Sequence, residues 1–240
     1  MIILTYILVH SKEGVIMIIL DKEKNENARA YALRVLLHNI TNLEFKPGSA
    51  ISEKDISAAL NLSRTPVREA LIELTKSGLV NIIPQKGSYI SKIDYNIIEE
   101  SRFIRLALEL AILKIACKEI PSNYLIKLKS NIVEQELCVN MSERTMLHNL
   151  DNVFHKLLFE AVGKQWSYNV ISSQMAYFNR FRILTLKALK VDKIINDHKT
   201  ILDAIENHNY ELAESVMTEH LGKKDKEKEE LLALYPEYFV

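Results

Sequence analysis

The sequence predicts a mainly α-helical protein, with a helix-turn-helix and a small β-hairpin at its N-terminal side and an antiparallel bundle of helices after them. Three observations support this fold class. Only six Gly and five Pro occur among 240 residues, so few residues interrupt the stretches in which apolar side chains recur at helical spacing. Two runs of β-type residues flank a turn at residues 84–87. Hydrophobic residues make up 48% and charged residues 26% of the chain, as in ordinary globular proteins, and this length allows two domains with cores of their own.

The first two helices are predicted at Asn27–Thr41 and Glu53–Leu60. Apolar residues keep helical spacing through the first range. A Pro-Gly turn at residues 47–48 separates the two ranges. Ser52 with Asp55 three positions later resembles a capping box, which would begin the second helix.

A third helix is predicted to follow after a short turn. It begins at Ser63 or Thr65, because Pro66 suits a first helical turn, where the missing N–H of proline has no helical partner in any case. It ends at Gly78, since glycine readily adopts the left-handed conformation that follows a helix.

The predicted hairpin consists of the β-type runs Leu79–Ile83 and Ser88–Ile93, joined by residues 84–87. Helix, short turn, second helix and hairpin in this order are the layout of a winged helix-turn-helix, in which the hairpin is the wing. Such a module places its second helix in the major groove of DNA.

The beginning of the third helix carries two arginines four positions apart, Arg64 and Arg68, which places both on one helix face. An arginine can bind a phosphate or form a bidentate contact with guanine in the major groove. A solvated helix face is the alternative explanation for this spacing, but it does not account for the surrounding helix-turn-helix and wing. We therefore predict that double-stranded DNA is contacted by Lys54, Ser63, Arg64, Thr65, Arg68, Lys86 and Gly87.

The charge distribution gives this prediction mild support. The formal net charge is zero, which excludes a uniformly basic nucleic-acid binder. Residues 22–92 nevertheless carry 11 Lys and Arg against 7 Asp and Glu, whereas residues 93–240 carry 19 against 22. The two cysteines, Cys117 and Cys138, offer neither a disulfide framework nor zinc-ligand spacing, so we expect a cytoplasmic protein.

Residues 1–16 are predicted to be a mis-annotated N-terminal extension. Residues 10–14 split the apolar start of the chain, and neither half reaches the ~20 residues that span a bilayer, so we expect no membrane contact. The start also lacks the features of a signal peptide. Lys12-Glu13-Gly14 can be encoded by a bacterial ribosome-binding sequence, and Met17 follows after two further codons. We therefore expect translation to start at Met17, which N-terminal sequencing of the native protein would test.

After Asp94, a suitable N-cap, the chain is predicted to be helical to its end. The predicted helices are Ile97–Cys117, residues 122–139, residues 142–162, Tyr168–Lys190, a helix that begins at Asp192 or Asn196, and a last long helix from Glu211. The mixed charge run Gly222–Glu230 is interpreted as the solvated end of that last helix. The short connections favour an antiparallel bundle over residues 94–240, next to a DNA-binding domain over residues 22–93.

Four polar residues stand out in the predicted bundle. Asp151 and His155 lie four positions apart on one helix face, and His198 and His220 occur singly in two later helices. Such an Asp/His pair is a natural contribution to a divalent metal site, which histidines from facing helices would complete. Lone helical histidines are more often surface or hydrogen-bonded core residues, and His148 is a rival ligand because it shares the face of Asp151 and His155. Spacing alone leaves a metal site and a structural polar cluster both open.

Three segments of the N-terminal region form a recognisable pattern. They are Ser63-Arg64-Thr65-Pro66-Val67-Arg68-Glu69-Ala70-Leu71, then Gly78-Leu79-Val80, and then Lys86-Gly87-Ser88-Tyr89-Ile90. With this pattern, residues 28–93 resemble the DNA-binding domain of the GntR family. The resemblance implies that Arg64, Arg68 and Lys54 contact DNA. The family more usually has Arg at the last of these positions, and Lys54 keeps the charge without the bidentate fork.

Residues 95–222 resemble the FCD-type ligand-binding domain of the FadR-like branch of that family. That domain has an Asp four positions before a His and single His residues in two later helices, and Asp151, His155, His198 and His220 match these positions in order. The resemblance implies a divalent metal ion there (zinc, nickel or manganese), a small carboxylate effector bound to it, and Arg105 facing the same cavity. The sequence Gly163-Lys164-Gln165 departs from the usual Gly-Asn of the family.

Together these expectations describe a homodimeric transcriptional regulator, most simply a repressor. Each subunit would place one winged helix on half of a palindromic operator, and the carboxylate effector would change the affinity for that operator. Two alternatives remain, a metal-independent effector site that uses Arg105 and a metal-dependent hydrolytic enzyme. No general base stands out beside the four candidate ligands, and an enzyme would not explain the winged helix, so we expect no catalytic residues.

Overall fold

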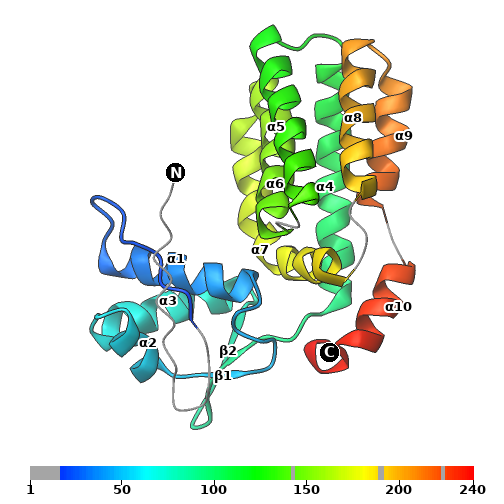
Figure 1. Ribbon diagram of the computed structural model, residues 1–240. Coiled ribbons are helices and arrows are strands. Elements are labelled where there is room, and N and C mark those ends of the chain that lie inside the picture. Colours follow the sequence, from blue (N-terminus) through cyan, green and yellow to red (C-terminus); the bar gives the residue numbers. More distant parts are fainter. Residues whose placement is uncertain (1–16, 142–143, 189–191, 223–224) are drawn as a thin grey trace. The chain divides into compact units, whose positions relative to one another are not determined.

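The computed structural model describes residues 17–141, 144–188, 192–222 and 225–240 (Figure 1). These residues form two compact units. Among the described residues, the first unit contains residues 17–95 together with Ala176–Phe181 and Tyr235–Val240. The second contains Asn96–Met175 and Arg182–Leu234. The predicted N-terminal extension, residues 1–16, lies outside the described residues.

The first unit contains the three helices expected from its sequence. They are α1 (Ala28–Thr41), α2 (Glu53–Ala59) and α3 (Arg64–Lys76). The side chain of Asn27 caps α1 by accepting a hydrogen bond from the N–H of Ala30 at 2.9 Å. Ser52 caps α2 in the same way by accepting from the N–H of Asp55 at 3.3 Å. After α3, Gly78 adopts a φ of +67°, the left-handed conformation that was expected of it.

A small antiparallel sheet completes the winged helix-turn-helix. Its strands are β1 (Ala50–Ile51), β2 (Val80–Ile83) and β3 (Gly87–Ile90), in the order β1-β3-β2. β2 and β3 form the predicted wing, with Val80 opposite Ile90. The sequence did not indicate β1, because two residues are too few to show an alternating pattern. The second β-type run was expected to reach Ile93, but β3 ends at Ile90, and Ile93 instead forms a parallel bridge with Phe239.

The core of the first unit lies between α1 and α3, which pack on each other. Apolar side chains three or four positions apart on the two helices form this contact. Six of them are at most 2% exposed: Val35, Leu36, Ile40, Val67, Leu71 and Leu74. Because α3 turns this face inward, the face that carries Arg64 and Arg68 is left in solvent.

The second unit is a bundle in which most of the helices run side by side (Figure 1). Most of its residues lie in α4 (Tyr95–Ala116), α5 (Ser122–Asn140), α6 (Arg144–Ala161), α7 (Gln165–Ala188), α8 (Asp192–Glu206), α9 (Tyr210–Leu221) and α10 (Asp225–Leu234). α5 packs against α6 and α8, and α8 packs against α9. Fully buried apolar side chains of the core include Leu113, Leu128, Phe154, Phe159 and Ile201. The predicted mainly helical fold, with a winged helix-turn-helix first and a helical bundle after it, is confirmed.

The C-terminal end differs from the sequence-based expectation. A last long helix running from Glu211 into the charge run was expected, but α9 ends at Leu221, where Gly222 adopts an extended conformation (φ −64°, ψ 173°). α10 is therefore a separate helix. The chain end after it, Tyr235–Val240, belongs to the first unit and contains a 3-10 turn at Pro236–Tyr238. Within the four described ranges, no helix is both long enough and apolar enough to cross a membrane.

Candidate metal centre and DNA-contact surface

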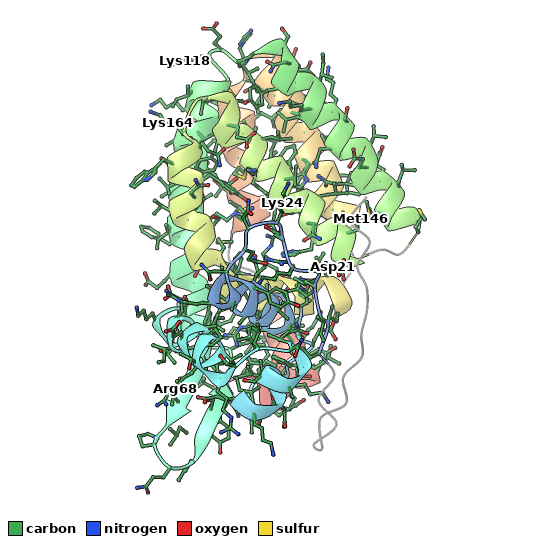
Figure 2. All side chains as sticks on the ribbon, turned by 90° about the vertical axis from the view of Figure 1, so that its left-hand side faces the viewer. Asp21, Lys24, Arg68, Lys118, Met146 and Lys164 are labelled. Carbon is green, nitrogen blue, oxygen red and sulfur yellow. The ribbon has the colours of Figure 1, made fainter. Side chains whose placement is uncertain are left out.

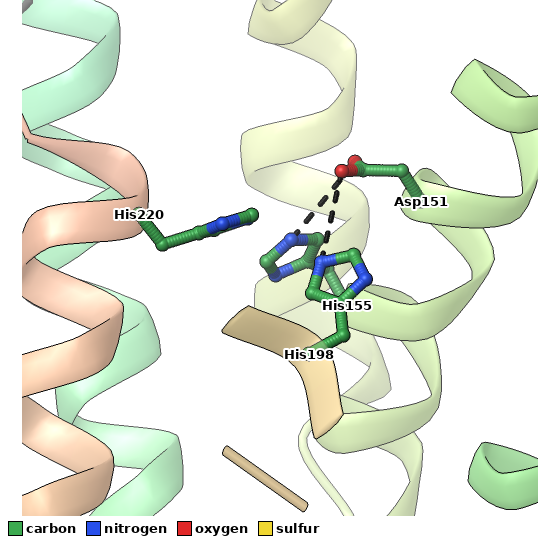
Figure 3. A group of neighbouring side chains, drawn as sticks. All are labelled: Asp151, His155, His198 and His220. Carbon is green, nitrogen blue, oxygen red and sulfur yellow. Dashed lines mark ion pairs between the residues drawn. The ribbon is translucent and has the colours of Figure 1, made fainter. Parts of the chain in front are cut away.

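Asp151 and His155 on α6, His198 on α8 and His220 on α9 converge in the second unit (Figure 3). Each side chain offers one potential ligand atom, and these atoms all lie within 4.8 Å of one another. Oδ2 of Asp151 is 3.9 Å from Nε2 of His155, and Oδ1 is 3.7 Å from Nε2 of His198. The four side chains are between 0% and 6% exposed. The structure thus brings together the four residues that the sequence singled out, and we call them the Asp/His cluster.

Each histidine of the cluster is held at its Nδ1 atom. His155 Nδ1 is hydrogen-bonded to Glu109 on α4, and His198 Nδ1 lies 2.8 Å from Oε1 of Gln135 on α5. His220 Nδ1 lies 3.1 Å from a carboxylate oxygen of Asp197, which directly precedes His198. An acceptor at Nδ1 places the imidazole proton there and leaves the Nε2 lone pair directed elsewhere.

Two of these Nε2 atoms are buried polar atoms with no hydrogen-bond partner in the described part of the chain, those of His155 and His198. An unpartnered buried acceptor is rare in folded proteins and is explained by a bound ion or water molecule. Three imidazole nitrogens and one carboxylate oxygen are a donor set that suits zinc and neighbouring divalent transition metals. At metal–ligand bonds of about 2.1 Å, two ligand atoms of one ion lie at most about 4.2 Å apart, so the 4.8 Å span of the cluster needs only a small contraction to hold an ion. The residues therefore fit a divalent metal ion.

The protonation states also suit a metal ligand set. Burial lowers the pKa of His155 to about 4 and holds that of His198 well below its ordinary value, so both imidazoles are neutral near pH 7. Burial by itself would raise the pKa of Asp151, but the adjacent Arg182 guanidinium holds it well below its ordinary value. Asp151, His155 and His198 thus combine an ionised carboxylate with two neutral imidazoles, the forms that bind metals.

Two arginines border the cluster. Arg105 on α4 donates from Nε to Glu109 at 2.7 Å, and its Nη2 atom lies 4.0 Å from Oδ2 of Asp151. Arg182 on α7 forms an ion pair with Asp151 and donates to Oδ1 of Asn152 at 2.7 Å. The side chains of Arg105 and Arg182 are only 5% and 14% exposed. Each of these buried guanidinium groups is thus paired with an acidic residue, Arg105 with Glu109 and Arg182 with Asp151.

Sequence reasoning anticipated Arg105 but missed Glu109, Gln135, Asp197 and Arg182. Glu109 gave a usable signal, because it lies four positions after Arg105 in an otherwise apolar helix. The other three are single polar residues whose role depends on which helices are neighbours, so no local sequence pattern indicated them. His148 is not part of the cluster; its Nε2 atom lies 3.2 Å from Nδ2 of Asn152.

The residues predicted to contact DNA lie on the surface of the first unit. Ser63 is the N-cap of α3, without a side-chain capping bond, so the helix begins between the two starts considered from the sequence. Exposed side chains or backbone are found at Lys54, Ser63, Arg64, Thr65, Arg68, Lys86 and Gly87. Figure 2 shows Arg68 on the outside of this unit.

Some arginines of the first unit form ion pairs with acidic side chains of the protein, whereas others have no such partner among the described residues and can contact DNA. Arg29 forms an ion pair with Glu73 at 2.7 Å, and Arg34 forms one with Glu26 at 2.8 Å. Within the described chain, Arg64 and Arg68 take part in no such pair. Together with the partial positive charge at the start of α3, these two guanidinium groups form a surface suited to phosphate and base contacts.

Two family models match the chain, the FCD domain at residues 100–223 and the gntR family of bacterial regulatory proteins at residues 31–90. Among curated relatives, the HTH-type transcriptional repressor RspR of Escherichia coli (strain K12) is 31% identical over 189 residues, which are 78% of this chain and 83% of RspR. An uncharacterized HTH-type transcriptional regulator of Streptomyces ambofaciens is 31% identical over 203 residues, which are 84% of this chain and 85% of the relative.

Solved structures share the fold. E. coli McbR/YncC has a TM-score of 0.72 at 17% identity, covering 88% of this chain and 99% of McbR/YncC. A GntR-type transcriptional regulator from Rhodococcus sp. RHA1 has a TM-score of 0.67 at 23% identity, covering 86% of this chain and 98% of that regulator. At these identities the likeness concerns the fold alone.

Proposed function

Because this chain belongs to the gntR family of bacterial regulatory proteins and carries an FCD domain, it is a DNA-binding transcriptional regulator and not an enzyme, and we propose that its affinity for DNA is controlled at the Asp/His cluster. One observation carries this proposal. Two buried imidazole Nε2 atoms, in His155 and His198, have no partner in the described chain and lie within 4 Å of an ionised carboxylate of Asp151.

We propose that Asp151, His155, His198 and His220 hold a divalent metal ion such as zinc, nickel or manganese. Such an ion would supply a positive charge with open positions for the oxygen atoms of a small carboxylate effector. Arg105 and Arg182 support this ligand class, because both bring a buried guanidinium to the same acidic residue. Glu109, Gln135 and Asp197 keep the three imidazoles oriented.

We further propose that residues 22–93 act as the DNA-binding domain and residues 94–240 as the ligand-sensing and dimerisation domain. The DNA contacts would be made by Lys54, Ser63, Arg64, Thr65, Arg68, Lys86 and Gly87. Two copies related by a twofold axis would read the half-sites of a palindromic operator in the cytoplasm. The name of RspR as a repressor supports repression as the direction of control.

A second candidate is an effector site that works without a metal ion. The ion pair between Arg182 and Asp151 favours it, because that carboxylate is already neutralised by a guanidinium. In this case Arg105 and Arg182 would bind the carboxylate of the effector directly.

Titration calorimetry of zinc into metal-free protein separates the two candidates. We expect binding at one site per chain, and loss of this binding in a His155→Ala, His198→Ala double variant. His208→Ala is the matched control, because His208 is exposed and lies outside the cluster. Equal zinc binding by the double variant and the wild type would exclude the cluster as the metal site.

The effector class can be tested by thermal unfolding of the zinc-loaded protein in the presence of small carboxylates and sugar acids. A ligand that binds only the folded state raises the melting temperature by mass action. We expect carboxylates to raise it in the wild type and to lose this effect in Arg105→Ala. Stabilisation by uncharged analogues of equal size would contradict a carboxylate site.

A further inference from the structure

The four residues after the wing, Ser91–Asp94, are held by hydrogen bonds from α7. Arg180 donates from Nη1 to the carbonyl of Ser91 at 2.6 Å. The hydroxyl of Tyr177 donates to the carbonyl of Lys92 at 2.9 Å and accepts from the N–H of Asp94. We call Ser91–Asp94 the linker segment. All of these residues belong to the first unit.

The C-terminal end of the chain holds the remaining residue of the linker segment. The N–H of Ile93 donates to the carbonyl of Tyr238 at 2.8 Å, and the N–H of Val240 donates to the carbonyl of Ile93 at 3.1 Å. Phe239 between them is 5% exposed. Every residue of the linker segment therefore has a hydrogen bond to α7 or to the chain end.

The hydrogen bond to Ser91 comes from Arg180, a charged side chain in a buried position, which is unusual in proteins. Its side chain is completely buried, and its guanidinium carbon lies 4.4 Å from the ring centroid of Tyr177. Burial lowers the pKa of Arg180 to about 10, so the group is still charged near pH 7. Since a buried charge is costly unless it is well partnered, this arginine fixes the linker segment to α7 at the expense of stability that an apolar residue could provide.

The same helix also reaches the Asp/His cluster. Two positions after Arg180, Arg182 belongs to the second unit and forms the ion pair with Asp151. α7 runs without interruption from Gln165 to Ala188. Because backbone hydrogen bonds join each turn of an α-helix to the next, neighbouring turns of α7 move together. A displacement of Arg182 would therefore move Arg180 and Tyr177 with it.

We propose that α7 couples the Asp/His cluster to the winged helix-turn-helix, with Arg182 sensing the state of Asp151 and with Arg180 and Tyr177 passing it to the linker segment. The proposal rests on the cluster being the control site, and it adds the route from that site to the DNA-binding unit. A packed helix of this kind responds to a ligand by a small shift between discrete arrangements. The stability of the hydrogen bonds between α7 and the linker segment would then depend on what Asp151 binds.

Amide hydrogen exchange of the full chain, followed by mass spectrometry, tests this route without any measurement on DNA. In the metal-free protein, Tyr177→Phe should speed exchange at the N–H of Asp94 about fivefold, since one hydrogen bond is lost. Arg182→Ala should change exchange at Ile93 and Asp94 by a similar factor, although it contacts neither. Tyr210→Phe is the control, because the hydroxyl of Tyr210 bonds to Glu214 within α9 and to no residue of the linker segment.

Unchanged exchange at Ile93 and Asp94 in Arg182→Ala would overturn the route through α7. If that variant does not fold, Arg182→Lys provides the same comparison, because lysine keeps the charge but cannot contact both Asp151 and Asn152. In a second arm, zinc alone should change exchange at the same amides in the wild type, and this change should be absent from Arg182→Ala at a zinc concentration that calorimetry shows to saturate that variant. Zinc that binds without changing the exchange overturns the coupling. A failure of zinc to bind overturns the proposed metal site, and the metal-free arm still decides the route.

Discussion

Gln135 fixes the tautomer of His198. Its amide oxygen accepts a hydrogen bond from Nδ1 of His198 at 2.8 Å, and its amide nitrogen donates to Oδ1 of Asn131 at 2.6 Å. Asn131 in turn donates to the backbone carbonyl of Leu150 at 3.1 Å. Because a carbonyl can only accept, the direction of each bond in this chain is determined. His198 therefore carries its proton on Nδ1 and presents a bare Nε2 atom to Asp151.

This relationship predicts that Gln135→Ala weakens metal binding although Gln135 is not a proposed ligand. Loss of such a supporting group lowers metal affinity about 10–100-fold. The buried Nδ1–H would also lose its acceptor, which reduces the free energy of unfolding by about 1–3 kcal/mol. Zinc calorimetry and urea unfolding measure the two effects. Gln165→Ala on α7 is the matched control, because Gln165 bonds to Asn169 and lies outside the cluster. Equal zinc affinities for Gln135→Ala and the wild type would contradict this role.

The metal-free protein should lose stability as the pH falls from about 6.5 to about 4. Burial lowers the pKa of His155 to about 4 and that of His148 to about 3, whereas an unfolded histidine takes up a proton near pH 6.5. The unfolded chain therefore binds more protons in this range, and acid favours unfolding. His155 alone contributes roughly 3 kcal/mol over the range, at 1.36 kcal/mol for each pKa unit.

Urea unfolding at about pH 7 and about pH 5 checks this pH dependence. We expect a lower free energy of unfolding at the lower pH and a smaller difference in His155→Asn, which has no titrating imidazole at that position. An equal stability of the wild type at both pH values would show that these histidines are not buried in their neutral form.

Gly78→Ala should reduce the free energy of unfolding by roughly 1–2 kcal/mol through backbone strain alone. Gly78 has a φ of +67°, which disfavours any residue with a Cβ atom. A Cβ atom there would lie 3.8 Å from the ring of Tyr177, an ordinary contact distance, so no clash adds to the strain. Ser77→Ala, at the preceding position, is the control and should have a small effect. A Gly78→Ala variant as stable as the wild type would contradict a required left-handed residue after α3.

Arg64→Ala and Arg68→Ala should each weaken specific DNA binding by about 1–3 kcal/mol if the arginine contacts a base, with no loss of fold. Both side chains are exposed and take part in no ion pair within the described chain, so their removal leaves the core of the first unit intact. Binding curves at fixed salt measure the loss, and circular dichroism checks the fold. Arg29→Ala, which removes a surface ion pair with Glu73, is the matched control. Wild-type affinity in both Arg64→Ala and Arg68→Ala would exclude α3 as the recognition helix.

The features of the fold and of the Asp/His cluster that could be predicted from the sequence are those with local sequence signals. The winged helix-turn-helix follows from local signals such as Ser52 at an N-cap and Gly78 after a helix, and the structure confirms both. Asp151 and His155 are recognisable because a spacing of four puts them on one face of α6. Such signals depend only on residues near in sequence.

Features that depend on distant neighbours could not be predicted. Gln135 and His198 are 63 positions apart, and nothing in either local sequence indicates that they meet. The placement of Ala176–Phe181 and Tyr235–Val240 with the first unit likewise depends on long-range hydrogen bonds, such as that from Arg180 to Ser91. A two-residue strand such as β1 has no periodic pattern, and its backbone pairing with β3 alone defines it.

The most direct test of the account is the affinity for DNA with and without zinc, measured by fluorescence anisotropy at fixed salt on an operator selected from random DNA by the wild-type protein. A coupling of about 1–3 kcal/mol corresponds to a change of about 5–150-fold in the dissociation constant of the wild type. The His155→Ala, His198→Ala double variant should bind the operator like the metal-free wild type and should not respond to zinc. A wild type whose dissociation constant is the same with and without zinc, or a double variant that responds as strongly as the wild type, would contradict control of DNA binding by a metal ion at the Asp/His cluster.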